Sequence, residues 1–217
     1  MSPAPIILEP AIGTPHTPLR LFFVRHGETE WSLSGQHTGR TDIPLTAHGE
    51  DEARQLGPCL QEIKFARVLT SPRQRAQKTC ALAGFGPVAT IEPDLAEWDY
   101  GDYEGQRSAD IRTGRPGWNV FRDGCPYGET PTEIAGRADK FIAGLQAQQG
   151  NVALFSHGQF GAALAARWIG LPVIDGQHFP LKAASLSILA HSPGHPEVRA
   201  IELWNAVPGP LAGRLAP

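Results

Sequence analysis

This sequence has few cysteines and lacks long apolar segments. No stretch of its 217 residues is long and apolar enough to span a bilayer, and its start lacks the basic and apolar regions of a secretory signal. The cysteines, Cys59, Cys80 and Cys125, are widely spaced and odd in number, which argues against a disulfide framework. A nucleophilic cysteine is the alternative, but none lies in a reactive motif. We therefore expect a cytoplasmic protein without membrane association.

An excess of positive charge is also missing. The formal net charge of −3 and the isoelectric point near 6.2 argue against a general nucleic-acid-binding or membrane-surface protein, so any basic patch must be local. With 41% hydrophobic residues the chain can bury a substantial core, and nothing marks a second one. We expect a proline-rich leader over residues 1–18, a single domain over 19–205 and a C-terminal tail over 206–217.

Strand-like and helix-like segments alternate between these ends. Strands are expected at Leu19–Val24, Arg67–Thr70, Val88–Ile91, Asn151–Phe155, Ser185–Ala190 and Val198–Trp204. Helices are expected at Thr46–Ile63, from Ser71 to Ala83, from Thr130 to about Leu145, and at Gln159–Ile169. This order predicts an α/β fold, a three-layer α/β/α sandwich with a mostly parallel sheet of about six strands.

Two of these helices have recognisable beginnings. Ser71-Pro72 is typical of a cap residue followed by proline at the first helical position. Thr130-Pro131-Thr132-Glu133 has the pattern of a capping box. The apolar residues that follow it share one helical face, a spacing that indicates core packing: Ile134, Ala138, Phe141, Ile142 and Leu145.

Two of the predicted strands end in a histidine followed by glycine. Arg25-His26-Gly27-Glu28 follows the first strand, and Ser156-His157-Gly158 follows a later one. Because parallel strands end at one edge of a sheet, both imidazoles are expected there, close enough to share a ligand. Arginine matches phosphate oxygens with a planar fork of donors, and histidine is a nitrogen nucleophile partly neutral near pH 7. The pair indicates phosphoryl chemistry.

Two further segments supply groups that this chemistry needs. Arg73 and Arg75 are expected in the first turn of a helix, where anions bind. Arg75 is the stronger ligand candidate, whereas Arg73 is equally explained as a solvated residue. The segment from Glu97 to Gly105 carries four carboxylates. A carboxyl near phosphate oxygens has a raised pKa and can donate a proton to a leaving alkoxide, although a solvated acidic loop is the alternative.

Together these motifs resemble those of the histidine phosphatase superfamily, the phosphoglycerate-mutase-like group. They are Arg25-His26-Gly27-Glu28-Thr29-Glu30-Trp31, Ser71-Pro72-x-x-Arg75-Ala76, Glu97-x-x-x-Gly101-x-x-Glu104-Gly105 and Ser156-His157-Gly158. Their order and spacing are similar to the family's over about residues 19–205. The segment from Trp31 to Gly39 and the surroundings of Glu97 look closest to the branch with sedoheptulose-bisphosphatase-like and acid-phosphatase-like members. Ser32 departs from a common family pattern, which has asparagine there.

The resemblance implies a role for each matching residue. His26 looks like the nucleophile that becomes phosphohistidine, Glu97 like the proton donor, and Arg25, Arg75 and His157 like the remainder of the phosphate pocket. The residues expected to contact the rest of the substrate are Thr38, Gly39, Tyr100 and Gly158. The implied activity is hydrolysis of phosphate monoesters, small phosphorylated metabolites such as sugar phosphates, with no cofactor and no metal. His37 is the best further candidate for a pocket neighbour.

Several alternatives stay open at this stage. A cofactor-dependent phosphoglycerate mutase uses the same phosphohistidine, but Trp98, Asp99 and Glu104 differ from the usual mutase residues and reduce positive charge. A non-catalytic phosphate-binding module and a metallohydrolase are weaker options, the latter because Arg25 and Arg75 would repel a divalent cation. A homodimer is also open. Three arginines could engage a second anionic group or be solvated: Arg112, Arg115 and Arg122.

Overall fold

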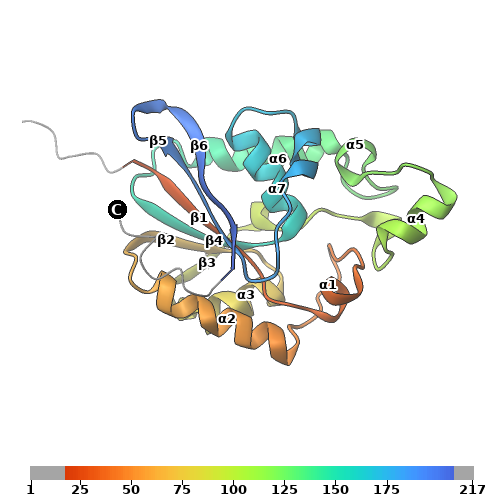
Figure 1. Ribbon diagram of the computed structural model, residues 1–217, viewed down its shortest axis with the longest axis horizontal. Helices are drawn as coiled ribbons and strands as arrows, with labels where there is room; N and C mark the ends of the chain where they lie inside the picture. The colour runs from red at the N-terminus through yellow and green to blue at the C-terminus, as the bar shows by residue number, and fades with distance from the viewer. Residues whose placement is uncertain (1–17, 208–217) are drawn as a thin grey trace, which may run out of the picture.

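A central mixed sheet organises the described part of the chain, which spans residues 18–207 of this computed structural model. Its strands are β1 (Arg20–Arg25), β2 (Phe65–Thr70), β3 (Ala89–Ile91), β4 (Asn151–Ser156), β5 (Leu186–Ser192) and β6 (His195–Ala206). Their order across the six-stranded sheet is β3-β2-β4-β1-β5-β6 (Figure 1). The first four strands are parallel, whereas β5 and β6 are antiparallel. The prediction of a mostly parallel sheet of about six strands is confirmed.

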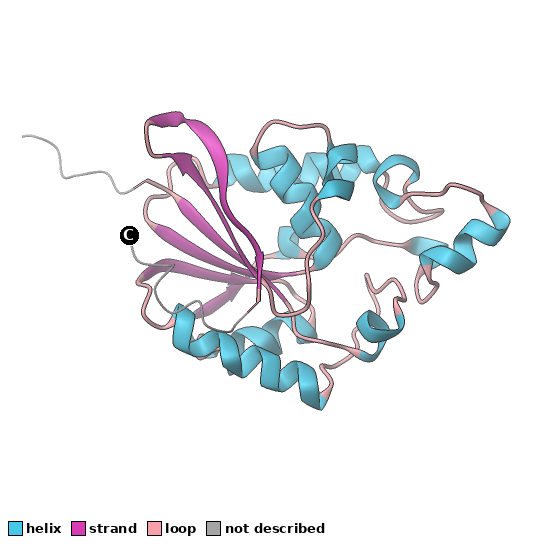
Figure 2. Ribbon diagram, in the orientation of Figure 1, coloured by secondary structure: helices cyan, strands magenta, loops and turns pink. Residues whose placement is uncertain are grey.

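Helices cover both faces of this sheet (Figure 2). One face packs against α2 (Ala47–Leu60) and α3 (Gln74–Leu82), and the other against α6 (Pro131–Gly144) and α7 (Gly158–Trp168). Successive side chains of a strand point to opposite faces. Phe22 accordingly belongs to the core beneath α2 and α3, whereas Phe23 belongs to the core beneath α6 and α7. The predicted three-layer α/β/α sandwich is confirmed.

Shorter helices lie beyond the carboxyl ends of the parallel strands. They are α1 (Glu30–Ser34), α4 (Ser108–Gly114) and α5 (Val120–Asp123), with single turns of 3₁₀ helix at Gly86–Val88, Pro93–Leu95 and Gly101–Tyr103 and a longer one at Val173–His178. In Figure 1, α1 and α4 stand apart from the sheet on the side where β1 ends. They therefore form the outer walls around the edge to which the strands deliver their polar side chains.

The beginnings of two helices test the expected caps. At α6 the hydroxyl of Thr130 accepts from the backbone N–H of Glu133 at 3.2 Å, and the Glu133 carboxylate accepts from Thr130 N–H at 2.8 Å. The predicted capping box is confirmed, and the apolar face that follows it is buried. At α3 the prediction was wrong, because the cap residue is Arg73 and the helix begins at Gln74. The Ser71 hydroxyl instead bonds to His157, a contact that no local pattern reveals.

The expected division of the chain stays a prediction. Most of the leader over residues 1–18 and of the tail over 206–217 lies outside the described residues. Within residues 18–207, none of the helices has both the length and the apolar character that crossing a bilayer requires.

Candidate active site

The ends of two adjacent parallel strands bring the two histidines together. β1 and β4 pair in register, with Arg25 opposite Ser156, and the backbone N–H of His26 donates to the Ser156 carbonyl at 3.0 Å. The imidazole centroids of His26 and His157 are 5.2 Å apart, with the rings edge to face. The structure therefore places both groups at one sheet edge, next to each other.

The imidazole of His26 is neutral and has one free nitrogen. Its Nδ1 lies 2.7 Å from the Gly27 carbonyl oxygen, which can only accept, so Nδ1 carries the proton and Nε2 keeps its lone pair. Burial holds the pKa of His26 well below its usual range, and the charges of Arg75 and Arg25 lower it further. A buried neutral imidazole beside two cations is suited to nucleophilic attack.

Gly27 allows the chain to turn away from β1 beneath the start of α2. A β-carbon at this position would lie 2.3 Å from the carbonyl oxygen of Gly49, so no larger residue fits. The N–H of Gly27 donates to the hydroxyl of Thr79 on α3 at 3.1 Å. The glycine after His26 is therefore a packing requirement that fixes where the imidazole leaves the strand.

Both ring nitrogens of His157 are engaged by protein groups. Arg75 donates from Nε to Nδ1 of His157 at 3.2 Å, so the ring proton is on Nε2, which lies 2.7 Å from the Ser71 hydroxyl. Burial and then the charge of Arg75 hold the pKa of His157 well below its usual range. This hydrogen-bonded chain fixes the tautomer and orientation of the ring beside His26.

Arg75 is fully buried, and most of its N–H groups donate to backbone carbonyls. It donates to Thr38 at 2.9 Å, to Gly39 at 3.3 Å and to Thr41 at 3.0 Å, in addition to its bond with His157. Burial lowers its pKa, an effect opposed mainly by the nearby carboxylate of Glu97. In this structure Arg75 fixes the loop over residues 38–41 and His157 at the same time.

Arg25 provides a donor without a partner. One terminal nitrogen donates to the Leu181 carbonyl, but its buried Nε has no hydrogen-bond partner within the described chain. Gly158 lies beside this group, since a β-carbon there would be 3.4 Å from Arg25 Nε. Unsatisfied buried donors are rare and costly, and a guanidinium stays charged in proteins. This free N–H therefore marks a position suited to an anion.

The carboxylate of Glu97 lies at the amino end of α7. Its Oε1 accepts from the N–H groups of Phe160 at 2.7 Å and Trp98 at 2.8 Å, and its Oε2 accepts from Gln159 at 3.0 Å. Burial raises the pKa of Glu97, whereas these three N–H groups and Arg75 oppose the rise. Oε2 accepts only one hydrogen bond and so is the oxygen better able to carry a proton.

A second carboxylate, Glu104, holds the loop over residues 38–41. Its Oε1 accepts from the N–H of Gly39 at 2.8 Å and from that of Thr41 at 3.0 Å. A β-carbon at Gly39 would lie 2.4 Å from the Trp98 carbonyl oxygen, so this position also needs glycine. The Gly39 N–H, expected to face substrate, is thus already used within the protein. No local sequence pattern indicates this bond, because Glu104 is 65 positions from Gly39 along the chain.

A cavity of about 330 Å³ opens onto the reactive groups. Of the residues expected at the site, six line it: Arg25, His26, Thr38, Glu97, Tyr100 and Gly158. Arg75, His157 and Gly39 do not, because they lie behind this wall and support it. His37 also lines the cavity, as predicted, and stacks on Tyr100 with ring centroids 4.5 Å apart.

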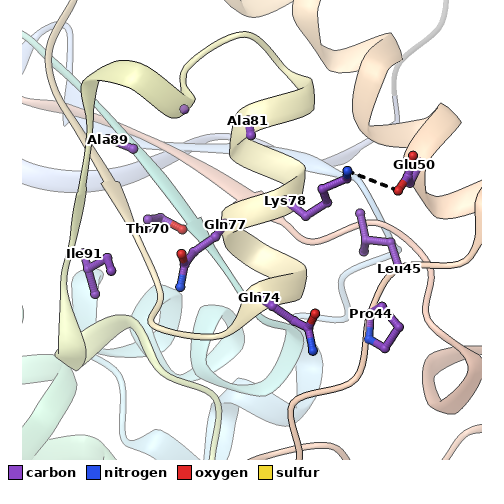
Figure 3. Close-up of a pocket in the computed structure, with 11 residues that line it drawn as sticks. Pro44, Leu45, Glu50, Thr70, Gln74, Gln77, Lys78, Ala81, Ala89 and Ile91 are labelled. Atoms are coloured by element: carbon purple, nitrogen blue, oxygen red, sulfur yellow. Dashed lines mark ion pairs between the residues drawn. The ribbon is translucent and has the colours of Figure 1, made fainter.

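A larger cavity of about 590 Å³ lies elsewhere, beside α3 and β3 (Figure 3). Its polar groups include Gln74, Gln77 and Lys78, and Lys78 pairs with Glu50 on α2 at 3.4 Å. No histidine or arginine is among the described residues that line it. The smaller cavity, which is lined by His26 and Arg25, is therefore the candidate active site.

Two of the three cysteines, Cys80 and Cys125, are too deeply buried to offer a competing nucleophile. All three are free thiols, and burial raises the pKa of Cys80 and Cys125 to about 12. Such thiols are protonated at neutral pH and unreactive. In the region from 18 to 207, no three histidine, cysteine or acidic side chains gather in an arrangement that could hold a metal ion.

Comparison of the sequence with known proteins identifies one family. The profile of the histidine phosphatase superfamily (branch 1) matches residues 21–204. An acid phosphatase of Mycobacterium tuberculosis is 39% identical, in an alignment covering 89% of this chain and 96% of that protein. A sedoheptulose 1,7-bisphosphatase of Saccharomyces cerevisiae is 36% identical and covers 71% of this chain and 69% of its own length.

Solved structures agree with these sequence matches. The structure of an open reading frame product from Mycobacterium tuberculosis has a TM-score of 0.82 with this chain at 36% sequence identity. The match covers 90% of this chain and 100% of that one. The resemblance drawn from the four motifs is thereby confirmed.

Proposed function

This chain belongs to the histidine phosphatase superfamily and is a phosphatase enzyme, and we propose that it hydrolyses small phosphate monoesters through a phosphohistidine at His26. Sugar phosphates are the proposed substrates. The observation that carries the proposal is the neutral, singly hydrogen-bonded imidazole of His26 next to the unpartnered Nε–H of Arg25 in one cavity. One group supplies attack, and the other supplies a fixed positive donor for a phosphoryl oxygen.

In the first half-reaction, Nε2 of His26 forms a bond to phosphorus while the bond from phosphorus to the ester oxygen breaks. Protonated Glu97 passes its proton to the departing alcohol oxygen. Burial, which raises the pKa of Glu97, favours the protonated form that this step needs. The free lone pair of Nε2 allows attack without a preceding proton transfer, because the ring proton is already on Nδ1.

In the second half-reaction, the oxygen of a water molecule attacks phosphorus and the bond to Nε2 breaks. Glu97 accepts the proton of this water, so phosphate is released and both groups return to their starting states. Both displacements pass through transition states in which charge is spread over the phosphoryl oxygens. Arg25 is proposed to stabilise this charge directly. Arg75 and His157 are proposed to act on the same charge and to hold the nucleophile's surroundings rigid.

The proposed substrate contacts follow from the cavity. Thr38, Tyr100 and Gly158 line it, and Gly158 lets the substrate approach the Arg25 guanidinium closely. Gly39 is proposed to act through the position of its loop, since its N–H is bonded to Glu104. No cofactor and no metal takes part in the proposed reaction.

Phosphoglycerate mutase activity is a less favoured reading of the same intermediate. Asp99 replaces a basic residue of the mutase pattern, and it pairs with Arg40 at 2.7 Å. Glu104, which replaces glutamine, adds a further negative charge near the loop. Both changes make the local charge more negative and so weaken the binding of a carboxylate-bearing ligand, which favours hydrolysis.

The test measures phosphate release from nitrophenyl phosphate and from sugar phosphates without added metal. His26→Ala is expected to abolish turnover with an unchanged circular dichroism spectrum. The matched control is His48→Ala, a surface histidine on α2. Rapid alkaline quenching should trap phosphate on wild-type protein only, because phosphohistidine is acid-labile. Unchanged activity of the His26 variant, or full inhibition of the wild type by a chelator, would overturn the proposal.

The cellular setting and assembly are part of the proposal. Three free thiols support a reducing, cytoplasmic location. Sedimentation at increasing protein concentration distinguishes a monomer from the homodimer that the sequence leaves open.

A further inference from the structure

The cavity at His26 is charged at one end only. Arg25 is the sole lysine or arginine among the described residues that line it, and Glu97 is the sole carboxylate. Away from these two, the polar side chains that line the cavity are uncharged, among them Ser32, Gln36, Thr38, Ser108 and Gln159. A bound substrate therefore meets one anion-binding group and, beyond it, a neutral polar surface.

His37 does not provide a second positive charge. It is stacked on Tyr100, and its Nε2 lies 3.1 Å from the Ser108 hydroxyl. Burial lowers the pKa of His37 to about 4, so its ring is neutral at physiological pH. His37 thus acts as a neutral hydrogen-bonding group in the cavity wall.

Four arginines near the cavity are committed to other partners, whereas Arg73, which lies outside the lining, has a buried Nε without a hydrogen-bond partner among the described residues. Arg40 pairs with Asp99 at 2.7 Å, Arg107 with Asp110 at 2.8 Å and Arg122 with Asp123 at 2.8 Å. Arg112 donates from Nε to the Trp118 carbonyl at 2.9 Å and does not line the cavity, although its charge reaches His37. Arg112 is tested below because its charge reaches His37, which lines the cavity.

Several neutral groups in the cavity have free polar ends. The Gln159 amide, the Tyr100 hydroxyl and the Trp31 indole N–H have no hydrogen-bond partner within the described part of the chain, and all three residues line the cavity. Amide and hydroxyl groups both donate and accept, which suits the hydroxyls of a polyol. The indole adds a flat apolar surface with a polar edge.

A second anionic group on the substrate would find no further cation among the described residues that line the cavity. It would leave water for a cavity in which the other ionisable side chain, Glu97, is protonated in the proposed substrate complex and offers no positive charge. Desolvating an unpaired charge is costly.

From this lining we propose that the enzyme selects phosphate monoesters whose remainder is an uncharged polyol and discriminates against substrates bearing a second phosphate or a carboxylate. The proposal rests on the proposed function and names the substrate class of the same site.

The test compares matched substrates that differ only in the second charge. Glycerol 1-phosphate is paired with 3-phosphoglycerate, and fructose 6-phosphate with fructose 1,6-bisphosphate. We expect kcat/KM for the uncharged partner of each pair to be higher by about tenfold or more, mostly through KM. Equal values, or preference for the more charged partner, would overturn the selectivity while leaving phosphatase function intact. Absence of His26-dependent hydrolysis of every ester, nitrophenyl phosphate included, would overturn the proposed function itself.

Charge variants separate the lining from its surroundings. Ser108→Arg places a cation in the neutral wall and is expected to narrow or reverse the preference, with Ser108→Gln as the uncharged control of similar reach. The increase in kcat/KM for the charged substrates in Ser108→Arg should become smaller as the salt concentration rises. Arg112→Gln is expected to leave both ratios unchanged, because Arg112 lies outside the lining. The proposal would be contradicted if kcat/KM for the charged substrate, relative to the uncharged one, fell in the Arg112 variant. It would also be contradicted if the two Ser108 variants had the same substrate preference.

Discussion

Arg75 and Glu104 hold the loop over residues 38–41 from opposite sides. Glu104 accepts from the N–H groups of Gly39 and Thr41, whereas Arg75 donates to the carbonyls of Thr38, Gly39 and Thr41. A charged acceptor and a charged donor thus satisfy both polar edges of one short piece of backbone. Because Arg75 also bonds to His157, the loop, the cation and the second histidine form one connected unit.

Replacing Glu104 with alanine is expected to disturb this unit. Glu104→Ala leaves the N–H groups of Gly39 and Thr41 without their acceptor, at a cost of about 1–3 kcal/mol in the free energy of unfolding. Glu104→Gln keeps an oxygen for both short bonds, which share Oε1, and should retain most of the stability and activity. Urea unfolding and kcat/KM on nitrophenyl phosphate measure both effects. Equal losses in the two variants would show that the charge, rather than the acceptor, matters.

Arg75→Lys keeps the positive charge but loses the planar guanidinium with its several N–H donors. A single ammonium cannot reach three carbonyls and Nδ1 of His157 from one position. We expect kcat/KM to fall by about 100-fold through displaced groups around the nucleophile. Arg54→Lys on the exposed side of α2 is the matched control and should behave like the wild type. Near wild-type kcat/KM for the Arg75 variant would show that only its charge contributes.

Glu97→Gln should reveal the acid through its dependence on leaving group. The glutamine keeps one oxygen, enough for the Phe160 N–H but not for the Gln159 N–H as well, and it cannot give a proton to the alcohol. Hydrolysis of sugar phosphates, whose alkoxides leave poorly, is expected to fall much further than hydrolysis of nitrophenyl phosphate. Comparing kcat for the two ester types on one preparation provides the measurement. Equal losses would remove Glu97 from the acid role.

The two buried histidines predict a loss of stability in acid. Burial holds the pKa of His26 and of His157 well below 6.5, so below pH 6.5 the unfolded chain binds protons that the folded chain does not. Their stabilising contribution is complete above pH 6.5 and is lost as the pH falls toward the folded pKa values. The slope is about 1.4 kcal/mol per pH unit for each histidine.

Urea unfolding at about pH 7.5 and about pH 5.5 measures this slope. His26→Gln should reduce the slope of the free energy of unfolding against pH by about the contribution of one histidine, whereas His48→Gln should leave this slope unchanged. The difference between variants isolates the histidines, because Glu97, whose pKa is raised, has a pH dependence of opposite sign. An unaltered slope in the His26 variant would show that this imidazole is not desolvated.

The sequence predicted the parts of the site that depend on local pattern. His26 and His157 each follow an apolar run, and strand polarity alone places both at one edge. Thr130 and Glu133 are three residues apart, so their reciprocal bonds are local as well. The sandwich followed from the alternation of strands and helices.

Contacts between distant segments could not be predicted in this way. Ser71 looks like a helix cap in sequence, yet its hydroxyl bonds to His157, 86 positions away. Glu104 is 65 positions from Gly39, and nothing local says which N–H group faces its carboxylate. For the same reason Arg75 was assigned to phosphate, although most of its donors meet backbone carbonyls.

The position of Glu97 at the first turn of α7 links proton transfer to the order of a helix. An ionised carboxylate holds the N–H groups of Gln159 and Phe160 more strongly than a protonated one, because its charge complements the helix dipole. In the proposed cycle, donating the proton therefore tightens the start of α7 just when the phosphorylated histidine must be kept in place. Taking a proton back from water relaxes that turn as phosphate departs. Each turnover thus alternates between stronger and weaker hydrogen bonds at the first turn of α7, governed by the same proton that completes the chemistry.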